Sequence, residues 1–278
     1  MEEPKVVTEK KRIDLVLVEK GFFPSREQAR AAIMAGEVTI NGMPVDKPGQ
    51  KVTADPDITV RAKLRYVSRG GLKLEKALQV FAINLQGRVI LDIGASTGGF
   101  TDCALQNGAR YVYAVDVGYG QIAWSLRNDP RVGVLERTNI RYLEKDVFKS
   151  GMPDFITIDV SFISLCLVLP RADFLLGNYE GVALVKPQFE AGREKVGKKG
   201  VVKDPAVHRD VLKKVINCLV ELNCSVLGLD YSPVKGPEGN IEYLLHFQKG
   251  GQAVGDNQEL IDAVVQAANN NLDLVNRR

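Results

Sequence analysis

The sequence predicts an α/β protein whose main part is an open, mostly parallel sheet, preceded by a small α+β module. Short apolar segments alternate with stretches of helical length through the larger part of the chain, as in strands joined by crossover helices. The last two apolar segments are separated only by SPVKGPEGN, which is too short for a crossover helix. That last pair should therefore be antiparallel.

The expected strands and helices follow one another along the larger part. We expect strands at 88–94, 111–117, 132–135, 154–160, 181–186, 224–230 and 241–247. Helices are expected near 99–107, 121–128, 164–176, 205–222 and 257–275. This order is typical of a Rossmann-like sheet covered by helices.

The first 60 residues have a different pattern. A short apolar helix should end at Gly21, and Ser25 should cap a second helix over 26–34 that stops at Gly36. Alternating apolar residues then lead into Asn41-Gly42, a strong tight-turn signal, and short strands should follow up to Val60. The sequence thus predicts a compact helix-helix-hairpin module.

Composition excludes several classes of protein. The 278 residues are 45% hydrophobic and 26% charged, which are ordinary globular values. The longest uncharged apolar stretch, 160–170, is far shorter than a membrane span. The N-terminus is charged and lacks an apolar signal segment, so we expect a cytoplasmic protein. Four widely spaced cysteines and two histidines argue against a disulfide framework and against a zinc site.

Positive charge is concentrated near the start of the chain. The whole net charge of +3 lies within the first 75 residues, and a basic stripe between Arg61 and Lys76 faces a single acid, Glu75. Such a stripe attracts a polyanion.

A glycine turn follows the first strand of the larger part. The segment LDIGASTGGFTD carries Asp92 at the strand end and glycines at 94, 98 and 99. Glycines at this bend expose backbone amides to a ligand, and Asp116 at the end of the second strand can accept hydrogen bonds from a ribose diol. These features predict a nucleoside cofactor site. The dinucleotide pattern G-x-G-x-x-G is absent, which weakens an NAD interpretation.

The first module resembles the alpha-L-type RNA-binding module of a ribosomal protein, tyrosyl-tRNA synthetases and pseudouridine synthases. The resemblance covers Arg12 to about Val60 and rests on the patterns R-x-D-x-x-L-V and S-R-x-x-A with a following I-N-G. It implies that Arg12, Arg26 and Arg30 contact phosphates, with Ser25 fixing the start of the second helix.

Seven ordered motifs over residues 11–248 resemble the TlyA-type ribosomal RNA methyltransferases, also labelled hemolysin A, whose catalytic half is similar to FtsJ-type 2'-O-methyltransferases. The motifs are SRGGLKLEKAL, LDIGASTGGFTD, AVDVGYGQ, ERTNIR, IDVSFISL, LVKPQFEAGRE and GNIEYLLH. The resemblance implies S-adenosylmethionine as cofactor and no metal. It also implies that the sheet is that of S-adenosylmethionine-dependent methyltransferases.

The resemblance further implies a catalytic tetrad of Lys73, Asp159, Lys186 and Glu242. A ribose 2'-hydroxyl attacks only when its proton leaves, so the site must align it with an activated methyl and accept one proton. Lys186 is the candidate base, provided that desolvation or a neighbouring cation such as Lys73 lowers its pKa. Asp159 and Glu242 would orient the two ammonium groups.

Further site residues follow from the same resemblance. Cofactor contacts are expected from the turn and the following strands, at Asp92, Gly94, Ser96, Thr97, Gly98, Phe100, Asp116, Val117 and Asn139. The concentration of positive charge in the linker, rather than the resemblance, predicts RNA contacts from Arg65 and Arg69. The segment from Arg193 to Lys203 is expected to be a mobile loop that could touch RNA, and Trp124 to pack under the sheet.

We therefore expect an RNA-binding module over 1–60, a basic linker over 61–71 and a methyltransferase domain over 72–278. The expected substrate is ribosomal RNA or a ribosomal subunit, methylated at a ribose 2'-hydroxyl. The resemblance suggests that this ribose belongs to a cytidine. A noncatalytic ribosome-assembly factor and a cytolysin remain the alternatives. The first would keep the fold without turnover. The second lacks a membrane-spanning stretch. The sequence does not predict an oligomeric state.

Overall fold

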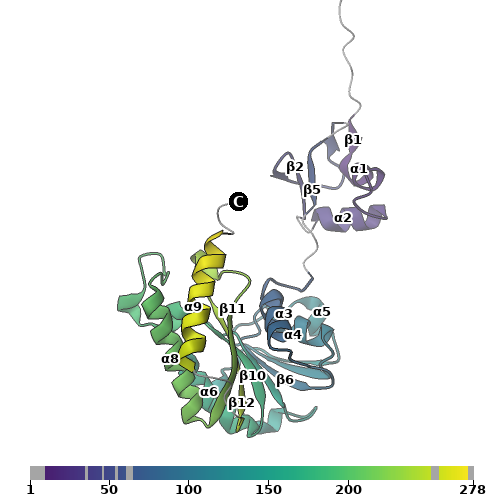
Figure 1. Cartoon of the computed structure of the whole chain (residues 1–278). Coiled ribbons are helices and arrows are strands. Elements are labelled where there is room, and N and C mark those ends of the chain that lie inside the picture. Colours follow the sequence, from purple (N-terminus) through teal and green to yellow (C-terminus); the bar gives the residue numbers. More distant parts are fainter. Residues whose placement is uncertain are drawn as a thin grey trace, which may run out of the picture. The chain divides into compact units, whose positions relative to one another are not determined.

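The structure is a computed structural model, and it describes residues 10–34, 37–45, 47–53, 56–60, 65–251 and 257–274. The chain divides into two compact units, residues 1–64 and 65–278 (Figure 1). Each unit has its own apolar core. The two units are therefore described separately.

The smaller unit is the helix-helix-hairpin module that the sequence predicts. Helices α1 (Ile13–Glu19) and α2 (Arg26–Met34) pack on a sheet of order β3-β2-β5, and a second pair joins β1 and β4. The strands are β1 (Lys11–Arg12), β2 (Val38–Ile40), β3 (Met43–Pro44), β4 (Lys51–Val52) and β5 (Ile58–Val60). Asn41 and Gly42 both have positive φ, 48° and 76°, as the two central residues of the predicted tight turn require. The expected helix stop at Gly36 lies outside the described residues.

The larger unit is built on a seven-stranded sheet of order β11-β12-β10-β9-β6-β7-β8. Its strands are β6 (Val89–Ile93), β7 (Tyr111–Val115), β8 (Val132–Leu135), β9 (Phe155–Ile158), β10 (Glu180–Val185), β11 (Cys224–Tyr231) and β12 (Tyr243–Lys249). The pairs from β8 to β10 are parallel, and β12 runs antiparallel to both β10 and β11. The predicted fold class is confirmed.

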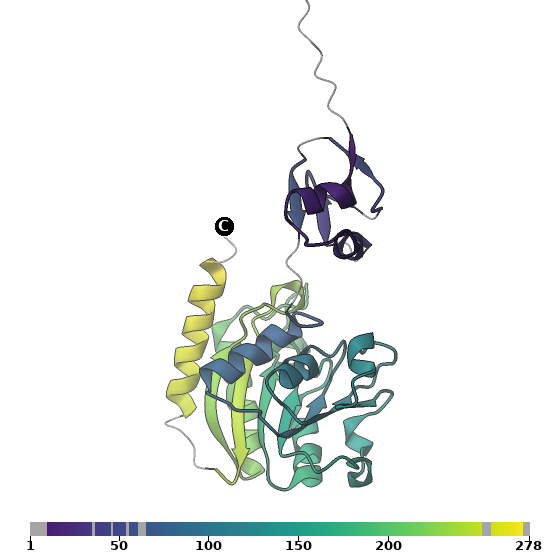
Figure 2. The ribbon, with the colours of Figure 1, turned by 90° about the vertical axis from the view of Figure 1, so that its right-hand side faces the viewer.

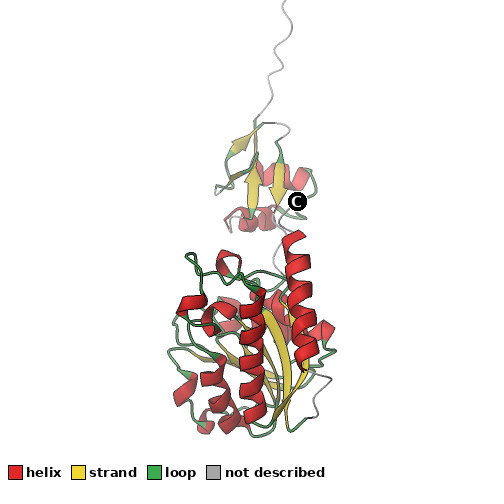
Figure 3. Ribbon diagram, turned by 60° about the vertical axis from the view of Figure 1, so that its left-hand side comes forward, coloured by secondary structure: helices red, strands yellow, loops and turns green. Residues whose placement is uncertain are grey.

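Helices cover both faces of this sheet (Figures 2 and 3). One face packs on α3 (Gly70–Val80), α4 (Gly99–Gln106) and α5 (Trp124–Arg127), and the other on α6 (Leu165–Leu176), α8 (Pro205–Glu221) and α9 (Asn257–Leu274). Short turns complete the unit: α7 (Pro187–Glu190), η1 (Ile140–Tyr142), η2 (Lys145–Val147), η3 (Arg193–Lys195) and η4 (Pro237–Gly239). Alternate residues of each strand reach opposite cores, as Ile90 and Leu91 do.

Helix α3 was not among the expected elements. Its first residues, Gly70 and Gly71, are poor helix formers, so they do not indicate that a helix begins there. The structure explains Gly71: a Cβ at this position would lie 2.3 Å from the ring of Tyr66. Close packing of the chain against the start of α3 therefore requires a glycine where the helix begins.

Two expectations about single side chains are wrong. Cys166 on α6 and Cys218 on α8 form a disulfide, with Cα atoms 5.7 Å apart, although the sequence argued against disulfides. Their separation of 52 residues gave no sign that these two helices face each other. Trp124 does not pack under the sheet, because its side chain is 76% exposed. Among the described helices, none combines the length and the apolar character needed to cross a membrane.

Candidate active site

The predicted glycine turn approaches a neighbouring strand too closely for a side chain. Gly94 follows β6 with φ of 86°, and a Cβ there would lie 2.5 Å from the carbonyl oxygen of Asp159. Gly98 has φ of 94° and precedes α4, and its Cβ would lie 2.3 Å from Leu126. The turn thus lies directly against the carboxyl end of β9, and several of its residues line the cavity beside it. The amides of Gly94 and Ala95 both donate to Val115 O, so they are already satisfied within the protein.

Asp92 lies beneath this turn rather than in the cavity. Its carboxylate is fully buried and accepts hydrogen bonds from Thr101 Oγ1 at 2.6 Å and from Thr157 Oγ1 at 2.7 Å. Burial raises the pKa of Asp92 to about 6. The expectation that Asp92 contacts the cofactor does not fit this placement, because the side chain instead ties β6 to α4 and β9.

A cavity of about 390 Å³ lies at the carboxyl ends of β6 and β7. Asp116 lines it, and its two carboxylate oxygens accept hydrogen bonds from the backbone amides of Ser96 and Gly118, both at 2.7 Å. Each oxygen keeps a further lone pair for a ligand. Asn139 also lines the cavity, where its side-chain oxygen caps η1 by accepting from Arg141 N at 3.0 Å.

This cavity, which we call the nucleoside cavity, suits an adenosine. Apolar side chains form most of its wall, and a fixed carboxylate stands at one side, which matches a flat base joined to a ribose diol. Its remaining wall is formed by Ile93, Val115, Val117, Ile140, Val160, Phe162, Ile163 and Val168, among others. The residues present therefore fit the nucleoside part of S-adenosylmethionine.

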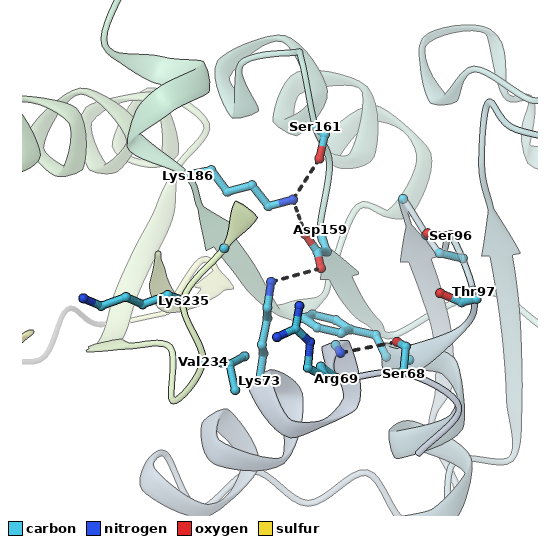
Figure 4. Close-up of a pocket in the computed structure, with 16 residues that line it drawn as sticks. Ser68, Arg69, Lys73, Ser96, Thr97, Asp159, Ser161, Lys186, Val234 and Lys235 are labelled. Atoms are coloured by element: carbon cyan, nitrogen blue, oxygen red, sulfur yellow. Dashed lines mark hydrogen bonds and ion pairs between the residues drawn. The ribbon is translucent and has the colours of Figure 1, made fainter. Parts of the chain in front are cut away.

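Four charged side chains form a continuous row beside the nucleoside cavity. Lys186 Nζ lies 2.5 Å from Asp159 Oδ1, Lys73 Nζ lies 4.0 Å from Asp159 Oδ2, and Lys73 Nζ donates to Glu242 Oε2 at 2.6 Å. Figure 4 shows Lys73 and Lys186 pointing toward Asp159 from different elements. Along the row, two lysines alternate with two acidic residues.

Each member of this row is placed by a different element. Lys73 is on α3, Asp159 follows β9, Lys186 follows β10, and Glu242 precedes β12. Glu242 is at the same sheet edge as the others because β12 runs antiparallel to β10. The structure thus brings together all four residues of the predicted tetrad.

Three residues of the tetrad, Lys73, Asp159 and Lys186, line a second cavity of about 300 Å³, which we call the tetrad cavity and which adjoins the nucleoside cavity; Glu242 is buried behind Lys73. Both cavities are lined by Gly94, Ser96, Asp159 and Ser161. Thr97, Phe100 and Arg69, all expected site residues, line the tetrad cavity. Two ligands bound in these cavities would meet beside Asp159.

Two residues of this region were not predicted from the sequence. Ser161 Oγ accepts a hydrogen bond from Lys186 Nζ at 3.0 Å. Phe162 has a positive φ of 64° and is 90% exposed. Its ring contacts that of Phe189, with the ring centroids 4.9 Å apart. The motif IDVSF contains both residues, but only the structure shows that Phe162 is exposed and that Ser161 contacts Lys186.

Comparison with known proteins identifies the family. A family model described as FtsJ-like methyltransferase matches residues 66–249. The 16S/23S rRNA (cytidine-2'-O)-methyltransferase TlyA of Mycobacterium tuberculosis is 46% identical over 92% of this chain and 96% of its own. The chain belongs to the TlyA-type family of FtsJ-like methyltransferases.

Other relatives in the TlyA-type family carry different names. YqxC of Bacillus subtilis is 55% identical over 92% of this chain and 91% of its own, and Hemolysin A of Brachyspira hyodysenteriae is 42% identical over 85% of this chain and 99% of its own. A solved structure from Streptococcus thermophilus, described provisionally as a hemolysin, covers 98% of this chain and all of its own at 47% identity, with a TM-score of 0.76.

The smaller unit matches the S4 domain over residues 11–58. In it, Arg12 and Arg26 both donate to the fully buried Asp14 at 2.9 Å, and hydrogen bonding to Arg12 lowers the pKa of Asp14 to about 2. The guanidiniums of Arg12 and Arg26 therefore neutralise a buried carboxylate, while part of each side chain remains exposed to solvent. Ser25 Oγ accepts from Gln28 N at 3.3 Å, as the predicted cap requires, and Arg30 is exposed.

The expected linker residues differ in placement. Arg65 forms an ion pair with Glu75, and Arg69 is exposed at the start of α3, where it lines the tetrad cavity. Arg61 lies outside the described residues. Within the described ranges, no group of three or more His, Cys, Asp or Glu side chains is arranged to hold a metal ion.

Proposed function

We propose that this chain transfers a methyl group from S-adenosylmethionine to the 2'-hydroxyl of a cytidine ribose in ribosomal RNA. The observation that carries the proposal is the row Lys186, Asp159, Lys73 and Glu242 at the junction of two cavities. Relatives named rRNA (cytidine-2'-O)-methyltransferase support the nucleotide and the class of RNA.

The nucleoside cavity would hold the cofactor. Asp116 would accept the ribose hydroxyls, the wall around Val117 and Asn139 would enclose the base, and the turn from Gly94 to Phe100 would border the amino-acid part. Bound S-adenosylmethionine supplies a methyl group on a sulfonium, which needs no further activation. The residues of the chain then have to orient the acceptor and accept its proton.

Lys186 is the proposed proton acceptor. It is 8% exposed and lines the tetrad cavity, and its Nζ contacts Asp159 and Ser161, which line both cavities. Only the neutral amine can accept a proton from the ribose hydroxyl. Lys73, held by the buried carboxylate of Glu242, would provide a fixed positive charge near the same hydroxyl.

The S4 unit would supply affinity for the ribosomal substrate. Its arginines, with the basic residues of the 61–71 linker, are suited to phosphates, and the methyltransferase domain would begin at about residue 72. Ribosomal subunits are then the partner, and the cytoplasm is the proposed location. This division also leaves the chemistry entirely to the larger unit.

The test is to map methylation on rRNA. Purified ribosomal subunits that lack the modification are incubated with the protein and methyl-labelled S-adenosylmethionine, and the RNA is digested and analysed by mass spectrometry. A single labelled cytidine whose 3' phosphodiester resists alkaline hydrolysis is expected, because that cleavage requires a free 2'-hydroxyl. Lys186→Ala serves as the matched control. Label on a base, or none at all, would reject the proposal, and RNA binding without label would favour the noncatalytic alternative.

A further inference from the structure

A third cavity, of about 900 Å³, lies beside the tetrad cavity and belongs to neither of the two ligand sites above. One wall is the segment 195–203, which we call the basic turn, and the other consists of the loop before β12 and the end of α9. Lysines on its wall are Lys195, Lys198, Lys199, Lys203 and Lys235.

The charge of this cavity is largely uncompensated. Lys198, Lys199 and Lys203 are exposed, and they form no ion pair within the part of the chain that the structure describes. Two acidic residues, Asp204 and Glu238, are also on the wall, and Lys195 pairs with Asp210 at 3.2 Å. Asp204 in addition caps α8 by accepting from Ala206 N at 2.8 Å. Five lysines against two wall acids still leave an excess of positive charge. Excess positive charge in a concave surface concentrates anions there.

The basic turn has a defined conformation. Gly200 N donates to Gly197 O at 2.8 Å, which closes a turn with Lys198 and Lys199 at its tip. Asn240 is buried and anchors the residues after the tip, since its side chain accepts from Val202 N at 3.1 Å and donates to Gly200 O at 2.9 Å. Gly197 N donates to Val201 O at 3.0 Å and joins the two sides of the turn. The sequence predicted a mobile loop here, and the structure gives it hydrogen-bonded anchors.

The same anchors connect the basic turn to the tetrad. Asn240 is two residues before Glu242, and Tyr243 directly follows it. The buried His208 bridges the two segments, because its ring lies 2.6 Å from Tyr243 Oη and 2.9 Å from Val202 O. The lysines at the tip are therefore held at a fixed position relative to Glu242.

Lys235 joins the two cavities, since it lines both the tetrad cavity and the third one. Figure 4 shows its side chain extending away from Lys73 and Lys186. A polyanionic strand that passes through the tetrad cavity would therefore meet the lysines of the third cavity on the side of Lys235. The cavity offers no arginine fork for a single bidentate anion; its lysines are point charges that suit successive phosphates.

We propose that the third cavity binds the phosphodiester backbone on one side of the methylated ribose, with Lys198 and Lys199 contacting neighbouring phosphates of a single strand. The inference rests on the proposed function, since it takes the ribose in the tetrad cavity as its starting point. Phosphate contacts of this kind set the register of a strand without reading its bases. The basic turn would thus help to determine which ribose reaches Asp159.

The test compares two charge reversals of equal size. Lys198→Glu with Lys199→Glu alters the basic turn, and Lys149→Glu with Lys213→Glu alters two exposed lysines that line none of the three cavities. Affinity for a fluorescein-labelled, cytidine-containing single-stranded RNA is measured over a range of salt concentrations. Loss of two phosphate contacts should weaken binding at least roughly tenfold at about 0.15 M salt and reduce the salt slope by about 1.4.

The control pair should retain nearly parental affinity and slope. Lys198→Gln with Lys199→Gln should give a smaller loss in the same direction, and calorimetric affinity for S-adenosylmethionine should be unchanged in every variant. A parental slope in both turn variants, or competition by cytidine monophosphate as effective as by the oligonucleotide, overturns the inference. If the parent fails to methylate rRNA, only the proposed function fails, because strand binding is measured independently of turnover.

Discussion

Replacing Asp92 by asparagine should remove a pH-dependent cost to stability. Asp92 is fully buried, and its pKa is raised from 3.8 to about 6, chiefly by burial. An asparagine of the same shape can still accept from one threonine hydroxyl and donate to the other, so Thr101 and Thr157 both keep a partner. The substitution therefore removes the charge and keeps one hydrogen bond to each threonine, and any cost of the reversed hydrogen bond is the same at every pH.

The sign and size follow from the raised pKa. The folded protein binds this proton more tightly than the unfolded chain does, so the contribution is favourable below the unfolded pKa and is lost as the pH rises from 3.8 to about 6. The difference corresponds to about 3 kcal/mol. About 0.5 kcal/mol of this is already lost at pH 4, so between pH 4 and pH 7 the stability of Asp92→Asn compared with the parent should improve by roughly 2 kcal/mol.

Urea unfolding followed by far-ultraviolet circular dichroism at several pH values measures this difference. Asp129→Asn is a control of opposite sign, because its hydrogen bond to Arg131 lowers the pKa of Asp129, so that variant should lose stability relative to the parent as the pH rises. A difference between Asp92→Asn and the parent that is constant with pH would show that Asp92 does not titrate in this range and would refute the reasoning.

Three further predictions concern the site. Lys186→Arg should slow single-turnover methylation at least roughly 100-fold, because a guanidinium does not give up its proton, while calorimetric affinity for S-adenosylmethionine is kept; parental rates would remove the base assignment. Asp116→Ala should weaken cofactor binding roughly tenfold or more in the same calorimetric measurement, through loss of charge-assisted hydrogen bonds, and unchanged affinity would contradict its contact with the ribose. Deletion of residues 1–60 should preserve cofactor binding and abolish methylation of ribosomal subunits, and full activity in the truncated chain would refute the division of labour.

Local patterns predicted the strands and turns well, because each depends on neighbours in the sequence. The run Val89–Ile93 is entirely buried, and Asn41-Gly42 adopts the positive φ values of its turn. Contacts between residues far apart in the sequence could not be predicted from these local patterns. Asp92 accepts from Thr157, 65 residues away, and nothing in the strand end distinguishes a buried carboxylate from one facing a ligand.

In the candidate site, too, local features were predicted from the sequence and long-range contacts were not. Strand ends and glycines predicted where a nucleoside would bind, but the tetrad came from family resemblance, since its members are spread from α3 to β12. The fixed turn at Lys198 and Lys199 was also beyond the sequence, because its anchor, Asn240, follows about 40 residues later. The tetrad and the anchored basic turn both depend on which strands become neighbours in the sheet.

The antiparallel strand β12 makes the site a late product of chain synthesis. Lys73 and Glu242 are separated by 169 positions, and β12 fills the gap between β10 and β11. A nascent chain that ends before β12 lacks Glu242, the carboxylate that binds Lys73, and the edge of β10 that pairs with β12 is still unpaired. Closing a loop of this length is slow compared with local folding. The site therefore cannot be completed until the chain through β12 has left the ribosome.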